Sequence, residues 1–327
     1  MKIKKTLALI MTAALTIGTM AGCSQTTLNY SKEISNTAKW EAATSNVEGT
    51  VNVDVKGVKE EVTFTVTGYK SNDRTFVDMK FNNTSGDIKI PEIKEYLDGT
   101  TVYINKSYFE GIYTMTGQAI PEGLSNIKQE YIAIDSSATG IDLNQLKALT
   151  TQPDAIAQVG KLVFGDNNDL DLPFVQNERV YTINLDTDKA VDLSAKAIKA
   201  AGNNIDKINT MFLGSKLTAE NIAQIKASVN DARFDATLPL VKAELAGSTI
   251  TSKEAFTDNS YTADFNMNLQ IKDAGKVSLE MKSTCVKSEV KEITLPTSEI
   301  KLTAEEYAKL ATPTNKTVAA TSNGVAK

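Results

Sequence analysis

Strict alternation of apolar and polar residues, in two separated stretches, limits what this chain can fold into more than any other feature of its sequence. The first stretch covers residues 47–81 and the second covers residues 264–285. In the clearest run, 264–272, every second residue is apolar: Phe265, Met267, Leu269 and Ile271. Successive side chains of a strand point to opposite faces of a sheet. Each stretch therefore predicts antiparallel strands with one apolar face.

Between these stretches the apolar residues follow helical spacing. Three leucines form one such pattern, namely Leu143, Leu146 and Leu149. Pro153 precedes a second pattern, and Thr218 has the chemistry of a helix N-cap. We therefore expect a helical middle at 141–232, with strand periodicity returning from Arg233. Because a sheet of two or three strands cannot cover its own apolar face, we predict one α+β domain. Its curved antiparallel sheet would resemble half a barrel and be covered by helices from the middle of the chain.

Shorter signals complete this pattern. Asp98-Gly99 is typical of a turn, and we expect a following hairpin made of Thr101–Asn105 and Tyr108–Thr116. Thr303 and Glu306 have the spacing of a capping box, which predicts the start of a last short helix.

The N-terminal residues have the parts of a secretory signal. A basic start precedes the apolar run Leu7–Ile17, which is shorter than the about 20 residues that cross a bilayer. Small residues then lead to Cys23. Ala21-Gly22-Cys23 resembles the lipobox of bacterial lipoproteins, although Met20 stands where leucine is usual. The resemblance implies a diacylglycerol on the sulfur of Cys23, and two acyl chains suffice for stable membrane anchoring.

These features divide the chain into four segments. Residues 1–22 are expected to be a signal peptide, and residues 23–40 a lipidated tether with a short helix. Residues 41–311 form the single α+β domain. Residues 312–327 lack apolar periodicity, which predicts a disordered tail. The expected location is the outer face of the cell membrane, outside the cytoplasm.

The sequence contains no histidine, which excludes every site that depends on an imidazole. It has no Gly-rich phosphate loop, and the acidic segment Asp166–Asp171 lacks the glycine of an EF-hand loop. We therefore predict no catalytic residue, no metal site and no cofactor. The net charge of −5 becomes −8 once residues 1–22, with three lysines and no acid, are removed. Such acidity argues against nucleic acid as a partner.

The second cysteine is expected to have a structural role. Cys285 shares one strand parity with Val277, Leu279 and Met281, which places its sulfur on the apolar face. We therefore interpret Cys285 as a core residue, with no disulfide partner once Cys23 is lipidated.

The apolar face of the predicted sheet offers a candidate ligand site. Five large side chains are candidates for its lining: Phe64, Met79, Phe265, Met267 and Met281. Methionine is flexible and polarisable, which suits contact with variable apolar ligands. The same residues also fit an ordinary core packed beneath helices, because every such sheet needs an apolar face. The sequence leaves both interpretations open.

The order of elements over residues 40–310 resembles that of half-barrel lipoproteins. These include the periplasmic lipoprotein carrier of Gram-negative bacteria and the lipid-carrying lipoproteins of mycobacteria. The segment Tyr96–Tyr103 is also similar to a Tyr-x-Asp-Gly-x-x-x-Tyr pattern in uncharacterised surface lipoproteins of Gram-positive bacteria. The resemblance implies a non-catalytic lipoprotein that holds an apolar or amphipathic ligand between sheet and helices. The alternative is a surface scaffold or sensor with a fully packed core, which binds a protein or the cell wall. The oligomeric state stays open.

Overall fold

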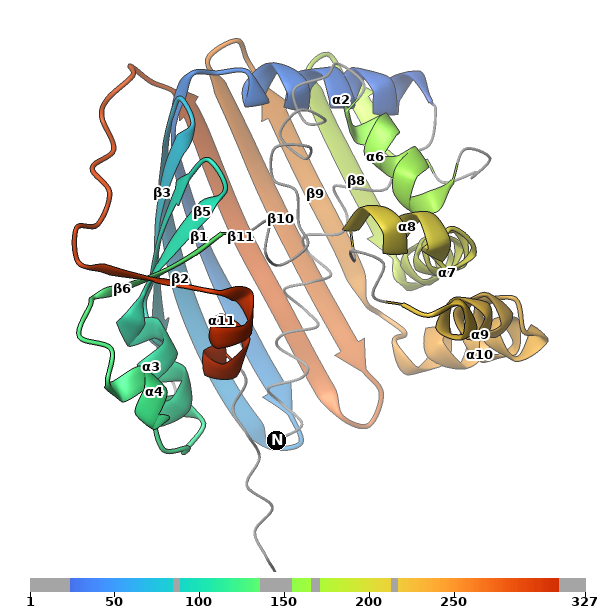
Figure 1. The fold of residues 1–327 in the computed structure, drawn as a ribbon. Coiled ribbons are helices and arrows are strands. Elements are labelled where there is room, and N and C mark those ends of the chain that lie inside the picture. Colours follow the sequence, from blue (N-terminus) through green and yellow to red (C-terminus); the bar gives the residue numbers. More distant parts are fainter. Residues whose placement is uncertain (1–23, 85–88, 136–154, 166–170, 213–216, 312–327) are drawn as a thin grey trace, which may run out of the picture.

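The computed structural model describes residues 24–84, 89–135, 155–165, 171–212 and 217–311. Within them the chain forms an α+β fold around one curved sheet of twelve strands, which confirms the predicted class (Figure 1). The predictions for the signal peptide, Cys23, the helix at 143–149 and the C-terminal tail fall outside the described residues.

The strands come from both ends of the chain and share one sheet. The N-terminal half supplies β1 (Ala42–Val55), β2 (Val58–Ser71), β3 (Arg74–Asn83), β4 (Ile93–Asp98), β5 (Thr101–Asn105) and β6 (Tyr131–Asp135). The C-terminal half supplies β7 (Val175–Asn177), β8 (Val180–Asp186), β9 (Thr249–Phe256), β10 (Ser260–Ile271), β11 (Gly275–Lys287) and β12 (Glu299–Leu302). Their order across the sheet is β12-β6-β5-β4-β3-β2-β1-β11-β10-β9-β8-β7. All neighbours are antiparallel except β12 and β6, which pair in parallel.

The two halves join where β1 pairs with β11. The antiparallel register runs from Ala43 opposite Lys287 to Val55 opposite Gly275. Gly275 has a φ of +131°, and a Cβ there would collide with the carbonyl oxygen of Asp54. Only glycine therefore lets the β10–β11 turn approach β1 so closely. The predicted union of the two strand stretches into one curved sheet is confirmed.

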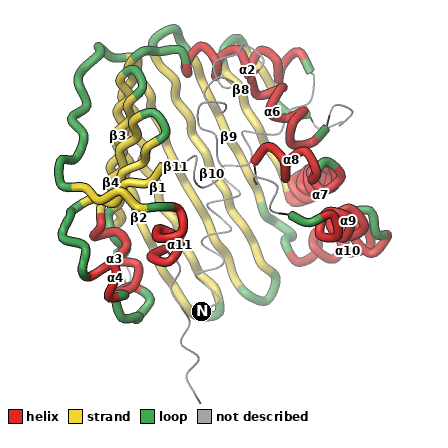
Figure 2. The backbone as a smooth tube through the Cα atoms, in the orientation of Figure 1, coloured by secondary structure: helices red, strands yellow, loops and turns green. Residues whose placement is uncertain are grey.

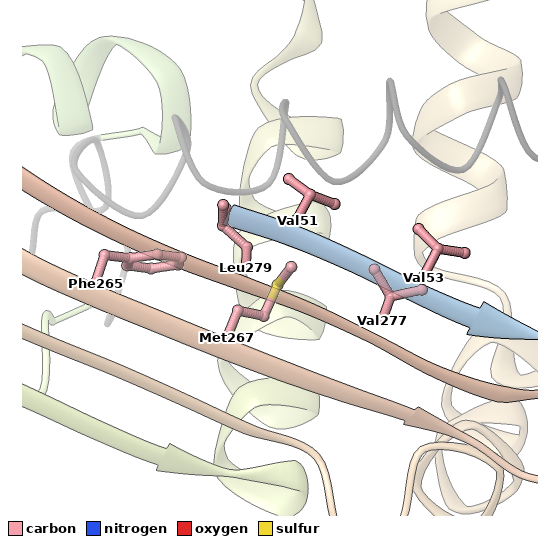
Figure 3. Close-up of a cluster of buried hydrophobic side chains, with 6 residues drawn as sticks. All are labelled: Val51, Val53, Phe265, Met267, Val277 and Leu279. Carbon is pink, nitrogen blue, oxygen red and sulfur yellow. The ribbon is translucent and has the colours of Figure 1, made fainter. Parts of the chain in front are cut away.

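A buried apolar cluster fills the middle of one sheet face across this junction. Residues that pair across strands lie on the same face, and here Val51 pairs with Leu279, which pairs with Met267. The cluster consists of Val51, Val53, Phe265, Met267, Val277 and Leu279, all at most 7% exposed (Figure 3). We call it the central cluster. It is the product of the alternation seen in the sequence.

The described helices form two groups, and one further helix crosses an end of the sheet (Figures 1 and 2). Beside β7 to β10 lie α6 (Ala155–Phe164), α7 (Thr187–Asn203), α8 (Ile205–Phe212), α9 (Ala219–Val229) and α10 (Ala232–Glu244). Near β5, β6 and β12 lie α3 (Lys106–Met115), α4 (Glu122–Ser125) and α11 (Ala304–Ala311). The helix α2 (Gln25–Ala38) crosses one end of the sheet. No helix of the described residues is long and apolar enough to cross a membrane.

Two helix starts follow the predicted capping chemistry. The hydroxyl of Thr218 accepts a hydrogen bond from the backbone N–H of Asn221 at the start of α9. At the start of α11, the backbone N–H of Thr303 donates to Glu306 Oε2 at 2.8 Å, and the N–H of Glu306 donates to the Thr303 hydroxyl. Both starts were therefore readable from local sequence.

The predicted second arm of a hairpin at Tyr108–Thr116 is wrong, because that segment forms α3. Thr101–Asn105 is a strand, but it pairs with β4 and β6 instead. Phe109 and Tyr113 lie one helical turn apart and are both buried, at 5% and 3% exposure. They pack in a cluster with Leu124 and Leu310. A short apolar segment fits the periodicity of a strand and that of a helix equally well, and here tertiary packing favoured the helix.

The predicted return to strand periodicity at Arg233 is also wrong. The helix α10 begins after Asp231, whose side chain accepts a hydrogen bond from the N–H of Arg233 at 2.8 Å. Pro239 lies inside this helix, although proline in a helix interior normally destabilises the helix. The helical middle therefore extends to Glu244, and strand structure resumes at Thr249.

The junction between the halves carries a stability prediction. Replacing Leu279 with alanine removes a side chain that is 5% exposed from the central cluster, so we expect the free energy of unfolding to fall by about 2–5 kcal/mol. Val286→Ala is the matched control, since Val286 lies on the same strand but is 43% exposed. Denaturant unfolding measures both variants. An equal loss in the two would contradict the assigned role of the cluster.

Candidate functional site

An apolar groove lies between two helices and the sheet. Its walls come from α7 and α10, and its floor comes from β9 and β10. The volume is about 420 Å³. Apolar residues that line it are Ala190, Val191, Ala195, Ile198, Phe234, Leu238, Val241, Leu245, Ile250, Met267 and Leu269. We call it the α7–α10 groove.

The walls arise from residues that recur at helical spacing on α7 and α10. In α10, apolar residues recur at Phe234, Leu238 and Val241, and this helical face extends to Leu245. The facing side of α7 carries small residues such as Ala195, so the two helices and the sheet do not fill the space between them. A cleft lined mostly by apolar side chains is the usual form of a small-molecule site.

Ion pairs between the helices cross the rim of the groove. Lys242 of α10 lies 2.8 Å from Asp192 of α7, and Lys199 of α7 lies 2.6 Å from Asp235 of α10. The hydrogen bond that Lys242 donates to the Asp192 carboxylate raises the pKa of Lys242. No residue of α10 is buried. The groove therefore has a polar rim and an apolar interior. The ion pairs of the rim are exposed and add little stability on their own.

Two polar side chains that line the groove, Thr187 and Ser248, form hydrogen bonds within the protein. The Thr187 hydroxyl donates to the carbonyl oxygen of Leu245 at 2.9 Å and accepts from the N–H of Ser248 at 3.0 Å. The Ser248 hydroxyl accepts from the N–H of Gln270 at 2.9 Å. With these groups already paired, the groove presents mainly hydrocarbon to a ligand.

The five predicted lining residues share one face of the sheet but do not form one cavity. The registers place all of them on the face that carries the central cluster: Phe64, Met79, Phe265, Met267 and Met281. Phe265 and Met267 belong to that cluster, and Phe64 and Met281 pack against it. Met79 pairs with Val66 and lies outside it. Of the five, Met267 alone also lines the α7–α10 groove.

Sequence reasoning missed the α10 wall of the groove. The signal was present, since Phe234, Leu238 and Val241 recur at helical spacing. The alternation after Arg233 favoured a strand instead, and Pro239 disfavours a helix in that segment. The groove is a tertiary feature that forms only when α10 lies beside α7.

A second cluster holds α2 on the sheet. Glu254 Oε2 accepts hydrogen bonds from the phenols of Tyr30 and Tyr261, each at 2.8 Å. Burial, followed by the charge of Glu254, raises the pKa of both tyrosines. The ring of Tyr30 lies 4.5 Å from that of Phe174, and it also packs edge-on against Tyr181. The cluster buries polar atoms with partners, as a stable interior requires.

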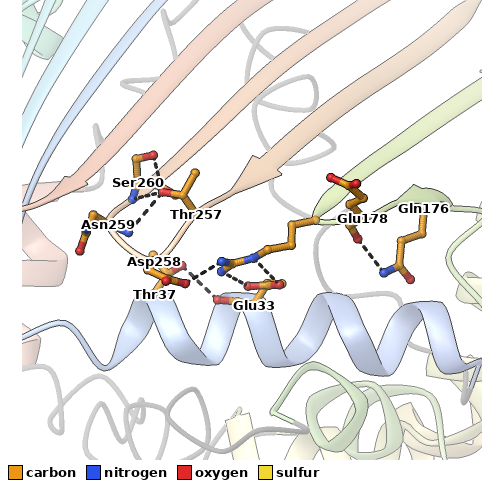
Figure 4. Close-up of polar contacts among 9 residues, drawn as sticks. Glu33, Thr37, Gln176, Glu178, Thr257, Asp258, Asn259 and Ser260 are labelled. Carbon is orange, nitrogen blue, oxygen red and sulfur yellow. Dashed lines mark hydrogen bonds and ion pairs between the residues drawn. The ribbon is translucent and has the colours of Figure 1, made fainter.

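An arginine completes this attachment (Figure 4). The guanidinium of Arg179 binds both carboxylate oxygens of Glu33 on α2, at 2.9 and 2.7 Å, and Asp258 at 2.7 Å. These hydrogen bonds raise the pKa of Arg179. Arg179 precedes β8, and Asp258 lies in the turn between β9 and β10. One side chain therefore connects α2 to two sheet loops, through a bidentate contact with Glu33 and one hydrogen bond to Asp258.

Cys285 departs from its predicted place in the core. It lies on the same sheet face as Leu279, but its side chain is half-buried and its thiol is free. Cys285 pairs with Ser45 and Tyr261 near the end of β11, beyond the central cluster. Burial raises the pKa of its thiol, which disfavours the reactive thiolate.

Metal-ligating side chains do not gather in the parts of the chain that the structure describes, where no group of three or more His, Cys, Asp or Glu could hold an ion. Residues 166–170 of the acidic segment lie outside those parts.

Fold and groove define an α+β protein with a large open curved sheet and an apolar groove at one side. No protein-family model matches the chain, and no curated protein matches it. Among solved structures it shows a likeness to one titled "Lipid-protein interactions in lipovitellin", with 7% identity and a TM-score of 0.22. The match covers 80% of this chain and 26% of that one, so this chain spans about a quarter of lipovitellin.

The tyrosine cluster carries a pH prediction. Burial raises the pKa of Tyr181 from 10.0 to about 12. In alkali the unfolded chain loses its phenolic protons first, so the free energy of unfolding falls as pH rises from about 10 to about 12. Tyr181→Phe should make this fall less steep, as followed by denaturant unfolding across that range. Tyr69→Phe, which removes a phenol outside the cluster, is the control. Equal slopes for Tyr181→Phe and the unmodified chain would refute this link.

Proposed function

We propose that this protein is a lipid-anchored lipoprotein on the outer face of the cell membrane, which binds an apolar or amphipathic ligand in the α7–α10 groove. The groove carries this proposal: it is open, has a volume of about 420 Å³ and is lined mainly by hydrocarbon. Binding would bury the ligand without covalent change. No catalytic residue takes part.

The size and lining of the groove suit an acyl chain or a similar hydrocarbon. Its volume lies within the roughly 300–1,000 Å³ of typical ligand pockets. Each buried CH₂ group contributes about 0.8 kcal/mol, so about ten of them supply roughly 8 kcal/mol against the cost of ordering the ligand. Polar recognition would fall to the rim, where Lys242 and Lys199 lie beside Asp192 and Asp235.

Membrane anchoring rests on the residues around Cys23. The basic start, short apolar run and Ala21-Gly22-Cys23 support export followed by acylation of the cysteine. A diacylglycerol provides the two acyl chains that stable attachment needs. The acidic balance of the chain agrees with a role away from nucleic acids.

One observation favours the alternative of a scaffold or sensor with a packed interior. The middle of the sheet is filled, since Phe265 and Leu279 are 6% and 5% exposed. A ligand therefore has no place between Phe265 and Leu279, whereas Phe64, Met79 and Met281 are only half-buried. If the groove also proved inert, a protein or cell-wall partner on the outer surface would be the better function.

The groove predicts a selective effect of charge. Leu238→Asp places a carboxylate in the apolar lining, so we expect a fluorescent long-chain fatty acid to bind at least about tenfold more weakly, the equivalent of about 1.4 kcal/mol. Fluorescence titration measures this on the full chain carrying Cys23→Ser, which removes the competing acyl group.

Leu240→Asp is the matched control for this experiment. Leu240 lies two residues away on α10, is 67% exposed and does not line the groove. Its variant should bind the fatty acid as the parent does. No binding by the parent, together with no lipid in native mass spectra, would eliminate the groove as a ligand site.

The anchor predicts a covalent modification. Mass spectrometry of protein extracted from membranes should find a diacylglyceryl group on Cys23 and no residues before it. Cys23→Ala should release the protein from the membrane fraction, whereas Cys285→Ala should not, because that half-buried thiol lies in β11. Recovery of unmodified Cys23 from the membrane fraction would disprove the anchoring.

A further inference from the structure

The proposed anchor point lies directly beside a fixed helix. Ser24, the residue after Cys23, is the N-cap of α2. Neighbouring Cα atoms are about 3.8 Å apart across a peptide bond. No flexible linker therefore separates an acylated Cys23 from the folded domain, although the sequence suggested a tether there.

The start of α2 is hydrogen-bonded to the other half of the chain. The hydroxyl of Ser24 donates to Asp171 Oδ1 at 2.8 Å, and that of Thr27 donates to the same oxygen at 2.6 Å. Thr27, Ser31 and Ser35 are fully buried on the inner side of α2. Together with the Tyr30 and Arg179 contacts described above, these bonds hold the helix in one orientation.

The outer side of α2 carries positive charge and no acid. The exposed residues of α2 and of its C-cap are Gln25, Lys32, Asn36 and Lys39. Their spacing of seven, four and three residues puts them on one helical face. The chain as a whole is acidic, with a net charge of −5. The charge of this face is thus opposite in sign to the net charge of the chain, and lysines near a bilayer are attracted to anionic lipid headgroups.

We propose that this outer face of α2 lies on the anionic bilayer that holds the Cys23 anchor, so that the domain has a defined orientation on the membrane. The inference rests on the proposed acylation of Cys23. The end of the sheet with the β9–β10 turn faces the lipid, because α2 crosses that end (Figure 1).

The orientation also places the α7–α10 groove. Tyr30 of α2 packs against Phe256 at one end of β9, whereas the groove contacts Ile250 nearer the other end. Six residues of strand, at about 3.3 Å each, set the groove roughly 20 Å from α2. The groove therefore lies away from the bilayer surface, where it can exchange ligand with a soluble partner or the surrounding solution.

Depth-dependent quenching tests the orientation on the lipidated protein. Acylation consumes the thiol of Cys23, so Cys285→Ser leaves a single introduced cysteine for a fluorophore. Asn36→Cys labels the outer face of α2, and Lys276→Cys labels the opposite end of the sheet. In vesicles of phosphatidylcholine and phosphatidylglycerol with a headgroup quencher, we expect several-fold stronger quenching at position 36. Equal quenching at both positions would overturn the orientation.

Charge reversal provides the matched comparison. Lys32→Glu with Lys39→Glu should weaken quenching at position 36, whereas Lys272→Glu with Lys276→Glu, at the opposite end, should not. An equal effect of the two pairs on a label at position 36 would also overturn the proposal. Mass spectrometry of the same samples reads acylation separately. Protein without lipid on Cys23 contradicts the anchoring itself, whereas lipidated protein that is quenched equally at both ends contradicts only the orientation.

Discussion

The pairing of β1 with β11 is the constraint on which the rest of the structure depends. Either half alone would leave an open sheet with an uncovered apolar face, which is unfavourable in water. Their antiparallel ladder, from Ala43–Lys287 to Val55–Gly275, merges both halves into one curved surface. Val51, Leu279 and Met267 then become neighbours and form the central cluster. The long intervening segment is free to supply helices, because its ends are already held by the sheet.

Packing differs between the middle and the side of this sheet. The middle is packed and stabilises the fold, whereas the side leaves space for the proposed ligand. The central cluster is filled with large side chains that interlock across strands. Beside it, α7 presents small residues and α10 contributes no buried residue, so a groove remains between the helices and β9–β10. At the other end of β9, Tyr30 and Glu33 attach α2 through Glu254 and Arg179. One sheet thus carries a core, a proposed ligand groove that adjoins the core at Met267, and a proposed membrane contact at one end.

Local chemistry made much of the fold predictable. Alternation gave the long strands β1, β2, β3, β10 and β11, and the capping residues Thr218 and Thr303 gave two helix starts. The wrong predictions concern segments whose sequence is compatible with both a strand and a helix. Residues 108–116 and the segment after Arg233 each contain apolar residues that suit a strand or a helix, and partners distant in sequence decided between them. The candidate site was predicted less well, since Met267 alone of the five residues lines the groove.

By itself, the sequence determined the fold class, the apolar face, the exclusion of imidazole chemistry and the expectation of an anchor at Cys23, because each depends on residue type or on spacing along the chain. Tertiary structure decided where space remains. Whether Phe265 lines a cavity or fills a core depends on which strands pair with β10 and which helix lies beside α7. It also decided that Ser24 caps a docked helix, since its partner Asp171 is 147 residues away. Such contacts between distant segments depend on the whole fold, and local periodicity does not predict them.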